Sequence, residues 1–269
     1  LAKCAHRYPS CTLALPANPL ASLMPLGSQE QRLLDVGGGT GTFVELVMDK
    51  FKDATLFEAN AGMLKQAHAR LGKKVECTKG SADDLSCYKP NTFHAATMNQ
   101  VIHHFPIENN YEFLGNVFKQ VFRVLKPGGA FVLNHASTEQ HEKGYWWFHF
   151  MPKACAEYCI KSPPMPIVIE KMREAGFIVD ESEINVPLEG VLMRDEYMKY
   201  GLEAAFKKTY RDGDSGWTMG EKTGELEGAQ KKIRQLQKAG KEKALVEQLE
   251  AQRKKVGQST FVTARKPLK

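Results

Sequence analysis

A glycine-rich segment near the start of the chain has the residue types of a ligand-binding turn. The segment Asp35-Val-Gly-Gly-Gly-Thr-Gly41 follows an apolar run at 32–36 and precedes a helix-like stretch at 42–51. Glycine adopts positive φ without strain and lets a ligand approach the backbone closely. In doubly wound sheets, ligands bind beyond the carboxyl ends of the strands. A plain tight turn needs fewer glycines than this, so the segment predicts a cofactor site.

Two kinds of cofactor compete for such a turn. The dinucleotide fingerprint GxGxxG would require a third glycine at position 42, which is Thr42 here. An NAD-dependent oxidoreductase is therefore the weakest of the functional hypotheses. The spacing of Gly37, Gly39 and Gly41, with Asp35 just before it, instead resembles motif I of the class I S-adenosylmethionine-dependent methyltransferases.

Four further features resemble that family in the same order along the chain. Glu58 ends the next apolar run, Gly80-Ser-Ala-Asp-Asp-Leu85 resembles the adenine-edge segment, and Asn99-Gln-Val-Ile-His-His-Phe105 resembles the small-molecule branch. Lys126-Pro-Gly-Gly129 is another recurrent family motif. The resemblance covers about residues 30–186 plus the last strand. Within the family, the pattern resembles the branch that contains quinone-biosynthesis and other small-molecule methyltransferases.

The resemblance implies S-adenosyl-L-methionine as cofactor and S-adenosyl-L-homocysteine as product. The implied role of Glu58 is to accept hydrogen bonds from both ribose hydroxyls, which suits a carboxylate. The family's usual acid at the adenine is replaced by Ser81, so recognition falls to Asp83 or to backbone groups. The expected cofactor-binding residues are Asp35, Gly37, Gly38, Gly39, Thr40, Gly41, Glu58, Ala59, Met63, Ser81, Ala82, Asp83, Asn99 and Gln100.

The implied chemistry is in-line displacement of an activated methyl group, which mainly requires alignment of donor and acceptor. A hydroxyl or amine acceptor would also use a general base. His103, His104 and His135 follow the expected fourth and fifth strands and are the candidates, with a structural role as the alternative for each. The sequence shows no metal-ligand cluster, and none is required.

Hydrophobic periodicity predicts the elements that position these residues. Strands are expected at 32–36, 54–58, 74–78, 93–98, 130–134, 177–186 and 259–264, and helices at 42–51, 63–71, 111–125 and 167–175. Alternation of this kind predicts an α/β fold with a doubly wound parallel sheet. The family resemblance implies that the sheet is seven-stranded, mostly parallel and Rossmann-like. A helical insertion precedes the last strand.

We expect an irregular arm at 1–28, a cofactor-binding core at 29–186, a helical insertion or lid at 187–257 and the last core strand at 258–269. The spacing of Leu226, Ala229, Ile233 and Leu236, followed by Gly240, predicts a two-helix hairpin. In the family, the sixth strand is parallel and the seventh antiparallel. The insertion should therefore flank the pocket, where Tyr145, Trp146 and Trp147 either line the acceptor site or pack the lid.

Charge is distributed unevenly along the chain. The net charge is +6, yet residues 1–220 hold 24 basic and 25 acidic side chains, whereas residues 221–269 hold 13 and 6. The basic excess suggests an RNA methyltransferase as one alternative. Glutamates interleave with the lysines, and no aromatic residue lies between Trp217 and Phe261 for base stacking. A solvated helix surface and a small-molecule acceptor are therefore favoured, with nucleic acid disfavoured.

The six cysteines lack metal-site spacing, and they indicate reduced thiols of a cytoplasmic protein. Cys155 and Cys159 would share one helix face, where core packing is favoured over metal binding.

No apolar run is long enough to span a membrane. Because the chain begins with Leu1, we expect a processed or truncated product with a possible targeting segment upstream. A non-catalytic protein that binds S-adenosylmethionine is the remaining alternative.

Overall fold

The computed structural model describes residues 31–188, 201–212 and 214–269. The expected irregular arm at 1–28 lies outside these residues. The chain divides into two compact units. We call them the sheet unit, whose described residues are 31–135, Pro163–Asn185 and Thr260–Lys269, and the helical unit, whose described residues are Ala136–Ser162, 186–188 and 201–259 without 213.

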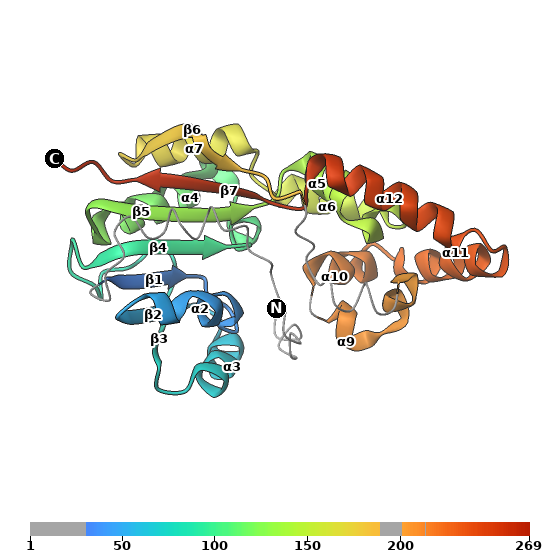
Figure 1. Ribbon diagram of the computed structural model, residues 1–269, viewed down its shortest axis with the longest axis horizontal. Coiled ribbons are helices and arrows are strands. Elements are labelled where there is room, and N and C mark those ends of the chain that lie inside the picture. The colour runs from blue at the N-terminus through green and yellow to red at the C-terminus, as the bar shows by residue number, and fades with distance from the viewer. Residues whose placement is uncertain (1–30, 189–200, 213) are drawn as a thin grey trace. The chain divides into compact units, whose positions relative to one another are not determined.

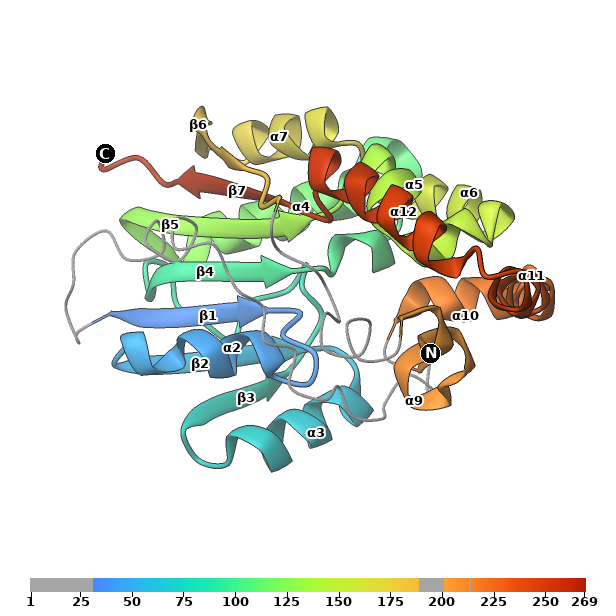
Figure 2. The same cartoon turned by 45° about the vertical axis from the view of Figure 1, so that its right-hand side comes forward.

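The sheet unit holds seven strands in the order β3-β2-β1-β4-β5-β7-β6 (Figures 1 and 2). Neighbouring strands from β3 to β5 are parallel, whereas β7 runs antiparallel to both β5 and β6. The strands are β1 (Arg32–Val36), β2 (Asp53–Glu58), β3 (Val75–Lys79), β4 (Phe93–Asn99), β5 (Leu125–His135), β6 (Ile178–Asn185) and β7 (Thr260–Arg265). The predicted fold class, a mostly parallel seven-stranded sheet, is confirmed.

Helices connect the strands of the sheet unit, as the alternating pattern predicted. They are α2 (Thr42–Val47), η1 (Met48–Lys50), α3 (Ala61–Leu71), η2 (Ile102–His104), α4 (Glu108–Val124) and α7 (Met165–Glu174). The apolar stripe of α4 forms much of the core together with α7, through residues such as Leu114, Phe118 and Met172. Burial of this stripe is the main term that holds the helix on the sheet.

The start of β5 differs from the sequence prediction. Strand β5 begins at Leu125 instead of Ala130, because Leu125 pairs with Phe93 before a register shift that leads to Ala130 opposite Ala95. The tract Lys126–Gly129 therefore lies within the strand as an irregularity, with Gly128 at φ +75°. Glycine at a positive φ is what such a bulge requires.

The helical unit contains three short segments after β5 and a longer run of helices before β7. The first group is α5 (Thr138–Gly144), η3 (Trp146–His149) and α6 (Pro152–Lys161); the second is η4 (Gly201–Phe206), α9 (Lys208–Arg211), α10 (Ser215–Lys222), α11 (Leu226–Lys238) and α12 (Glu242–Val256). Helices α11 and α12 form the predicted hairpin (Figure 1), and Gly240 at φ +66° lies in the connection between them. The helical unit also includes Ala136–Ser162, which the sequence prediction placed in the cofactor-binding core at 29–186.

Candidate cofactor site

The glycine turn is attached to the neighbouring strand by its own backbone. Directly after β1, the amides of Gly37 and Gly38 both donate to the carbonyl of Phe57 in β2, at 2.7 and 3.2 Å. Gly37, Gly39 and Gly41 have φ of +70°, +57° and +80°. These left-handed conformations are the reason that glycine is needed at the three positions. The turn thus lies at the carboxyl ends of β1 and β2.

The glycines differ in what surrounds them. A Cβ added to Gly37 would lie 2.6 Å from Val101, one added to Gly38 would lie 2.6 Å from Leu56, and one added to Gly41 would lie 2.6 Å from Leu71. At Gly39 the added Cβ would meet only the Sδ atom of Met63, at 3.9 Å. Three glycines therefore allow close packing of the protein itself, whereas Gly39 borders open space.

Glu58 is held at the edge of this open space. Its Oε2 accepts a hydrogen bond from the Gly39 amide at 2.9 Å, and its Oε1 accepts one from the Asn60 amide at 2.7 Å. Asn60 in turn caps α3 by accepting from the amides of Gly62 and Met63. Each carboxylate oxygen can accept a second hydrogen bond. The carboxylate is therefore fixed in position and can still receive a ligand's hydroxyls.

Asp35 is a buried carboxyl group next to the same turn. Its side chain is 1% exposed, and Oδ1 accepts a hydrogen bond from the Thr97 hydroxyl at 2.7 Å. Its Oδ2 has no hydrogen-bond partner among the described residues and lies 2.8 Å from the position of a Cβ on Gly38. Burial raises the pKa of Asp35 to about 7, against the lowering effect of the Thr97 hydrogen bond, and Glu58 adds to the rise. The group is therefore poised between its neutral and charged forms near neutral pH.

The expected adenine segment follows β3. Ala82 is buried, Ser81 is exposed and Asp83 is half-buried. The Ser81 hydroxyl donates to Oδ1 of Asp83, so the two candidate side chains form one polar pair. Of the remaining expected residues, Thr40 is buried within the turn and Ala59 is exposed directly after Glu58.

Asn99 and Gln100 are joined by a residue that the sequence analysis did not select. Asn134, near the end of β5, donates through Nδ2 to Oδ1 of Asn99 at 2.5 Å. Its carbonyl accepts from the Gln100 amide at 2.9 Å, and its Oδ1 accepts from the Gln100 side chain at 3.4 Å. Gln100 has φ +52°, which is uncommon for a residue other than glycine. Such strain is found where surrounding structure enforces it, often at functional sites.

The three candidate histidines have different surroundings. His103 is buried and His104 is exposed, and their rings lie 4.0 Å apart in η2. His135 is fully buried, and its Nε2 lies 3.0 Å from the Pro163 carbonyl. Because a carbonyl only accepts, Nε2 carries the proton in this bond. Burial lowers the pKa of His135 to about 4, so the ring is neutral at pH 7.

The aromatic candidates Tyr145, Trp146 and Trp147 are buried in the core of the helical unit. Trp147 stacks on Trp217 with ring centroids 5.9 Å apart, and the Tyr145 hydroxyl donates to the Gln258 carbonyl at 2.8 Å. Each ring therefore has a packing role within its own unit. That any of them contacts an acceptor stays a prediction.

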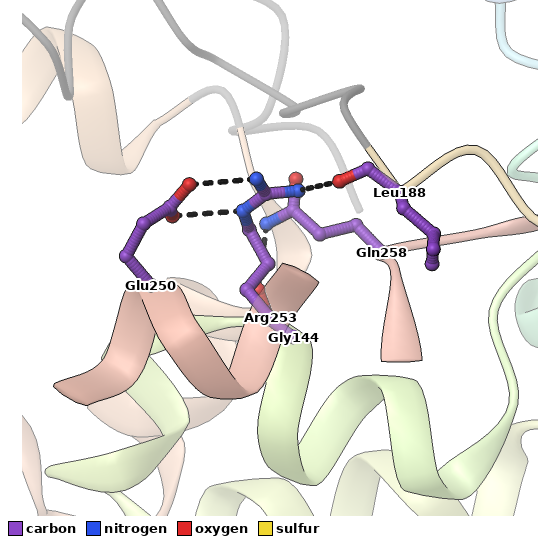
Figure 3. Close-up of polar contacts among 5 residues, drawn as sticks. All are labelled: Gly144, Leu188, Glu250, Arg253 and Gln258. Atoms are coloured by element: carbon purple, nitrogen blue, oxygen red, sulfur yellow. Dashed lines mark hydrogen bonds and ion pairs between the residues drawn. The ribbon is translucent and has the colours of Figure 1, made fainter. Parts of the chain in front are cut away.

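A polar cluster at the end of α12 was also not selected from the sequence (Figure 3). The buried Arg253 forms an ion pair with Glu250 at 2.6 Å and donates to the Leu188 carbonyl at 2.7 Å. Nearby, the Gln258 side chain donates to the Gly144 carbonyl at 2.8 Å. A buried charge is tolerated when it is paired and hydrogen-bonded in this way. The cluster fixes the chain within the helical unit just before β7 begins.

The part of the chain that the structure describes was searched for a metal site and for a membrane-spanning helix. No group of three or more His, Cys, Asp or Glu side chains there could hold a metal ion. Within the same residues, no helix is both long and apolar enough to cross a membrane.

Known proteins resemble this chain in sequence and in fold. Residues 34–133 match the sequence model of a family described as a methyltransferase domain. The chain is 28% identical over 168 residues to the ubiquinone/menaquinone biosynthesis C-methyltransferase UbiE of Rhizobium meliloti, covering 58% of this chain and 62% of that protein. It is 30% identical over 145 residues to the UbiE protein of Bartonella quintana, covering 50% and 54%. The chain thus spans less than two thirds of the length of these relatives.

A solved structure from Anabaena variabilis, described as a methyltransferase assigned to an antibiotic biosynthesis pathway, matches with a TM-score of 0.72 at 17% identity. The match covers 94% of this chain and 98% of that chain. At this identity the likeness concerns the fold, which it shares with the sheet topology described above. Residues 34–133 therefore resemble a methyltransferase domain, and the fold is like that of the Anabaena variabilis structure.

Proposed function

We propose that the protein transfers a methyl group from S-adenosyl-L-methionine to a small-molecule acceptor by in-line displacement, leaving S-adenosyl-L-homocysteine. The observation that carries the proposal is the open space at Gly39, bordered by the fixed carboxylate of Glu58. An additional side chain would fill this space, and the neighbouring glycines are already packed. The turn can therefore accept a ligand at Gly39, whereas its other glycines are packed against the protein itself.

The residues present fit this cofactor. Glu58 would accept hydrogen bonds from the ribose hydroxyls, and the pair Ser81–Asp83 would face the adenine. Gly39 would let the cofactor approach the backbone, with Met63 beside it. The unpartnered oxygen of Asp35 would compensate positive charge at the amino acid end. When bound, the cofactor supplies a methyl group that its sulfonium has already activated.

The remaining residues would align and deprotonate the acceptor. Asn134 would hold Asn99 and Gln100 at the carboxyl ends of β4 and β5. Among the three histidines, His104 is the exposed one and is our choice for a base if the acceptor carries a proton. His135 is enclosed, and its low pKa makes it a weak base. The C-methyltransferase relatives suggest an aromatic quinone precursor as the first acceptor to test.

The RNA alternative receives no support from the helical hairpin. Arg234 is engaged with Glu203 and lies over the Phe206 ring at 3.8 Å, and Arg253 is buried against Glu250. Two of the basic side chains thus serve packing within the unit. Methyl transfer to a small-molecule acceptor therefore remains the function that the geometry supports best.

Calorimetry with S-adenosylhomocysteine tests the cofactor site. Gly39→Arg should abolish binding, because the new side chain fills the space beside Met63. Gly240→Arg is the matched control, since Gly240 has φ +66° and nothing within 4 Å of an added Cβ, so it carries the same backbone strain in the helical unit. Unchanged affinity in a folded Gly39→Arg protein would contradict the site.

Transfer of a labelled methyl group tests the reaction itself. The wild-type protein should label an acceptor from a panel of phenols, quinols and small acids, and Glu58→Gln should reduce labelling by weakening ribose contacts. Tight cofactor binding with no labelled product across the panel would favour the non-catalytic alternative. Labelling of RNA in preference to every small molecule would favour the RNA alternative.

A further inference from the structure

Helix α6 of the helical unit carries two cysteines on one face, outside the cofactor site. The Sγ atoms of Cys155 and Cys159 lie 4.0 Å apart, within contact range for a thiol hydrogen bond. Cys155 is 6% exposed and packs in the aromatic core of the unit, whereas Cys159 is half-buried at its edge. The pair therefore combines one sheltered and one more accessible thiol.

A metal site does not account for the pair. A structural zinc site takes four protein ligands, and no third Cys, His, Asp or Glu ligand joins the pair among the residues that the structure describes. Plain core packing accounts for Cys155 but does not require a second thiol at its side. The arrangement of an accessible cysteine next to a second, resolving cysteine is instead typical of redox-sensitive sites.

We propose that Cys155 and Cys159 are a redox modification site, which a peroxide oxidises to a disulfide within α6. The Cys159 thiolate attacks one peroxide oxygen, the O–O bond breaks, and Cys159 becomes a sulfenic acid while the peroxide is reduced to an alcohol or water. The Cys155 sulfur then loses its proton and attacks the Cys159 sulfur. The S–O bond breaks, and the leaving hydroxide takes up the proton as water.

The electrostatics of the pair support this order of events. The pKa of the Cys159 thiol is lowered, chiefly because the Cys155 thiol hydrogen-bonds to it. The pKa of the Cys155 thiol is raised by the same contact and by burial. The thiolate is the nucleophile in such chemistry, and Cys159 is the more accessible of the two thiols, so attack begins at Cys159.

The disulfide requires the end of α6 to loosen. Side chains at i and i+4 of a helix have Cβ atoms about 5–6 Å apart, whereas a disulfide needs roughly 3.8 Å. Cys159 lies in the last turn, where the Ser162 amide donates to the Cys159 carbonyl at 3.1 Å. The Ser162 hydroxyl also donates to the Tyr158 carbonyl at 3.2 Å. Oxidation should weaken these bonds, so faster amide exchange over 159–162 is the expected structural signature.

Peptide mass mapping of the full-length chain tests the proposal. The tryptic peptide 154–161, between Lys153 and Lys161, contains both cysteines and no others. After treatment with hydrogen peroxide and then with iodoacetamide in denaturant, so that the buried Cys155 is reached, this peptide should lose two hydrogen atoms in mass and carry no alkyl group. Dithiothreitol should restore both thiols to full alkylation.

Two controls make the result decisive. Cys159→Ser should leave Cys155 reduced and alkylated, and its circular dichroism should match that of the wild type. The exposed Cys87 reports that the oxidant was active, since it should gain oxygen or a mixed disulfide. If Cys87 is oxidised while peptide 154–161 is alkylated twice, or carries only oxygen on Cys159, the proposal is wrong.

Discussion

Asp35 provides a quantitative test of the cofactor site through the pH dependence of stability. In the unfolded chain its pKa is that of an ordinary aspartate, 3.8, whereas burial raises the pKa to about 7 in the folded protein. Between these values the folded state holds a proton that the unfolded state has lost. The free energy of unfolding therefore falls as pH rises through this window. A difference of about three pKa units corresponds to about 4 kcal/mol.

Asp35→Asn removes this titration. The asparagine Oδ1 can still accept the hydrogen bond from Thr97, but its amide would be buried where Oδ2 now lacks a partner. That loss is of order 1–3 kcal/mol and does not change with pH. We therefore expect the variant to be less stable than the wild type near pH 4. It should gain about 4 kcal/mol relative to the wild type by pH 8.

Urea denaturation from pH 4 to pH 8 measures this difference. Far-ultraviolet circular dichroism must be the probe, because the three tryptophans, at 146, 147 and 217, all lie in the helical unit. Thr97→Val is the companion variant. Loss of its hydrogen bond should raise the pKa of Asp35 further and extend the window to higher pH. Parallel stability profiles for wild type and Asp35→Asn would refute the reasoning.

The same titration should respond to the cofactor. A ligand with a sulfonium and an ammonium group favours the charged carboxylate, so binding near pH 7 should release a proton from Asp35. Calorimetry in buffers of different ionisation enthalpy counts this proton. The release should disappear in Asp35→Asn.

Three further substitutions test other parts of the structure. Asn134→Ala should cost about 1–2 kcal/mol of stability and weaken cofactor binding, because Asn99 and Gln100 lose their shared partner; an unchanged urea midpoint would contradict this. Trp147→Ala should cost about 3–5 kcal/mol in fluorescence-detected unfolding, since the ring is buried in a core, and a loss below about 1 kcal/mol would argue for an open lining position. His135→Gln should change the pH dependence of stability with the opposite sign to Asp35→Asn, as circular dichroism at pH 4 and 7 would show.

The strands of the sheet could be predicted from the sequence because local patterns determine them. The short apolar run at 32–36, which ends in turn residues, predicted β1 with the bounds that the structure has. The antiparallel direction of β7 followed from the family resemblance. The glycine turn was identifiable for the same reason, since Gly37, Gly39 and Gly41 are adjacent in sequence. Which glycine borders open space could not be predicted. That depends on Val101, Leu56 and Leu71, which come from other elements.

The hydrogen-bond partners in the site could not be predicted either, because they join residues that are distant in sequence. Glu58 was selected because it ends a strand, but its hydrogen bond from Gly39 joins residues 19 apart in sequence. Asn134 was not among the site residues predicted from the sequence. Its pairing with Asn99 depends on the register of β4 and β5, which no local pattern specifies. Likewise, the run Tyr145–Phe148 could not reveal whether its rings line a pocket or fill a core.

Asp35 and His135 also explain why a wild-type profile alone would mislead. His135 has an ordinary pKa of 6.5 unfolded and about 4 folded, so the unfolded state binds the extra proton and stability rises with pH across that window. The contribution is about 3 kcal/mol, opposite in sign to that of Asp35. Between pH 4 and 6.5 the two slopes should nearly cancel in the wild type. His135→Gln should then uncover the falling slope of Asp35, and Asp35→Asn the rising slope of His135. A flat profile in both variants would show that neither group titrates as its burial requires.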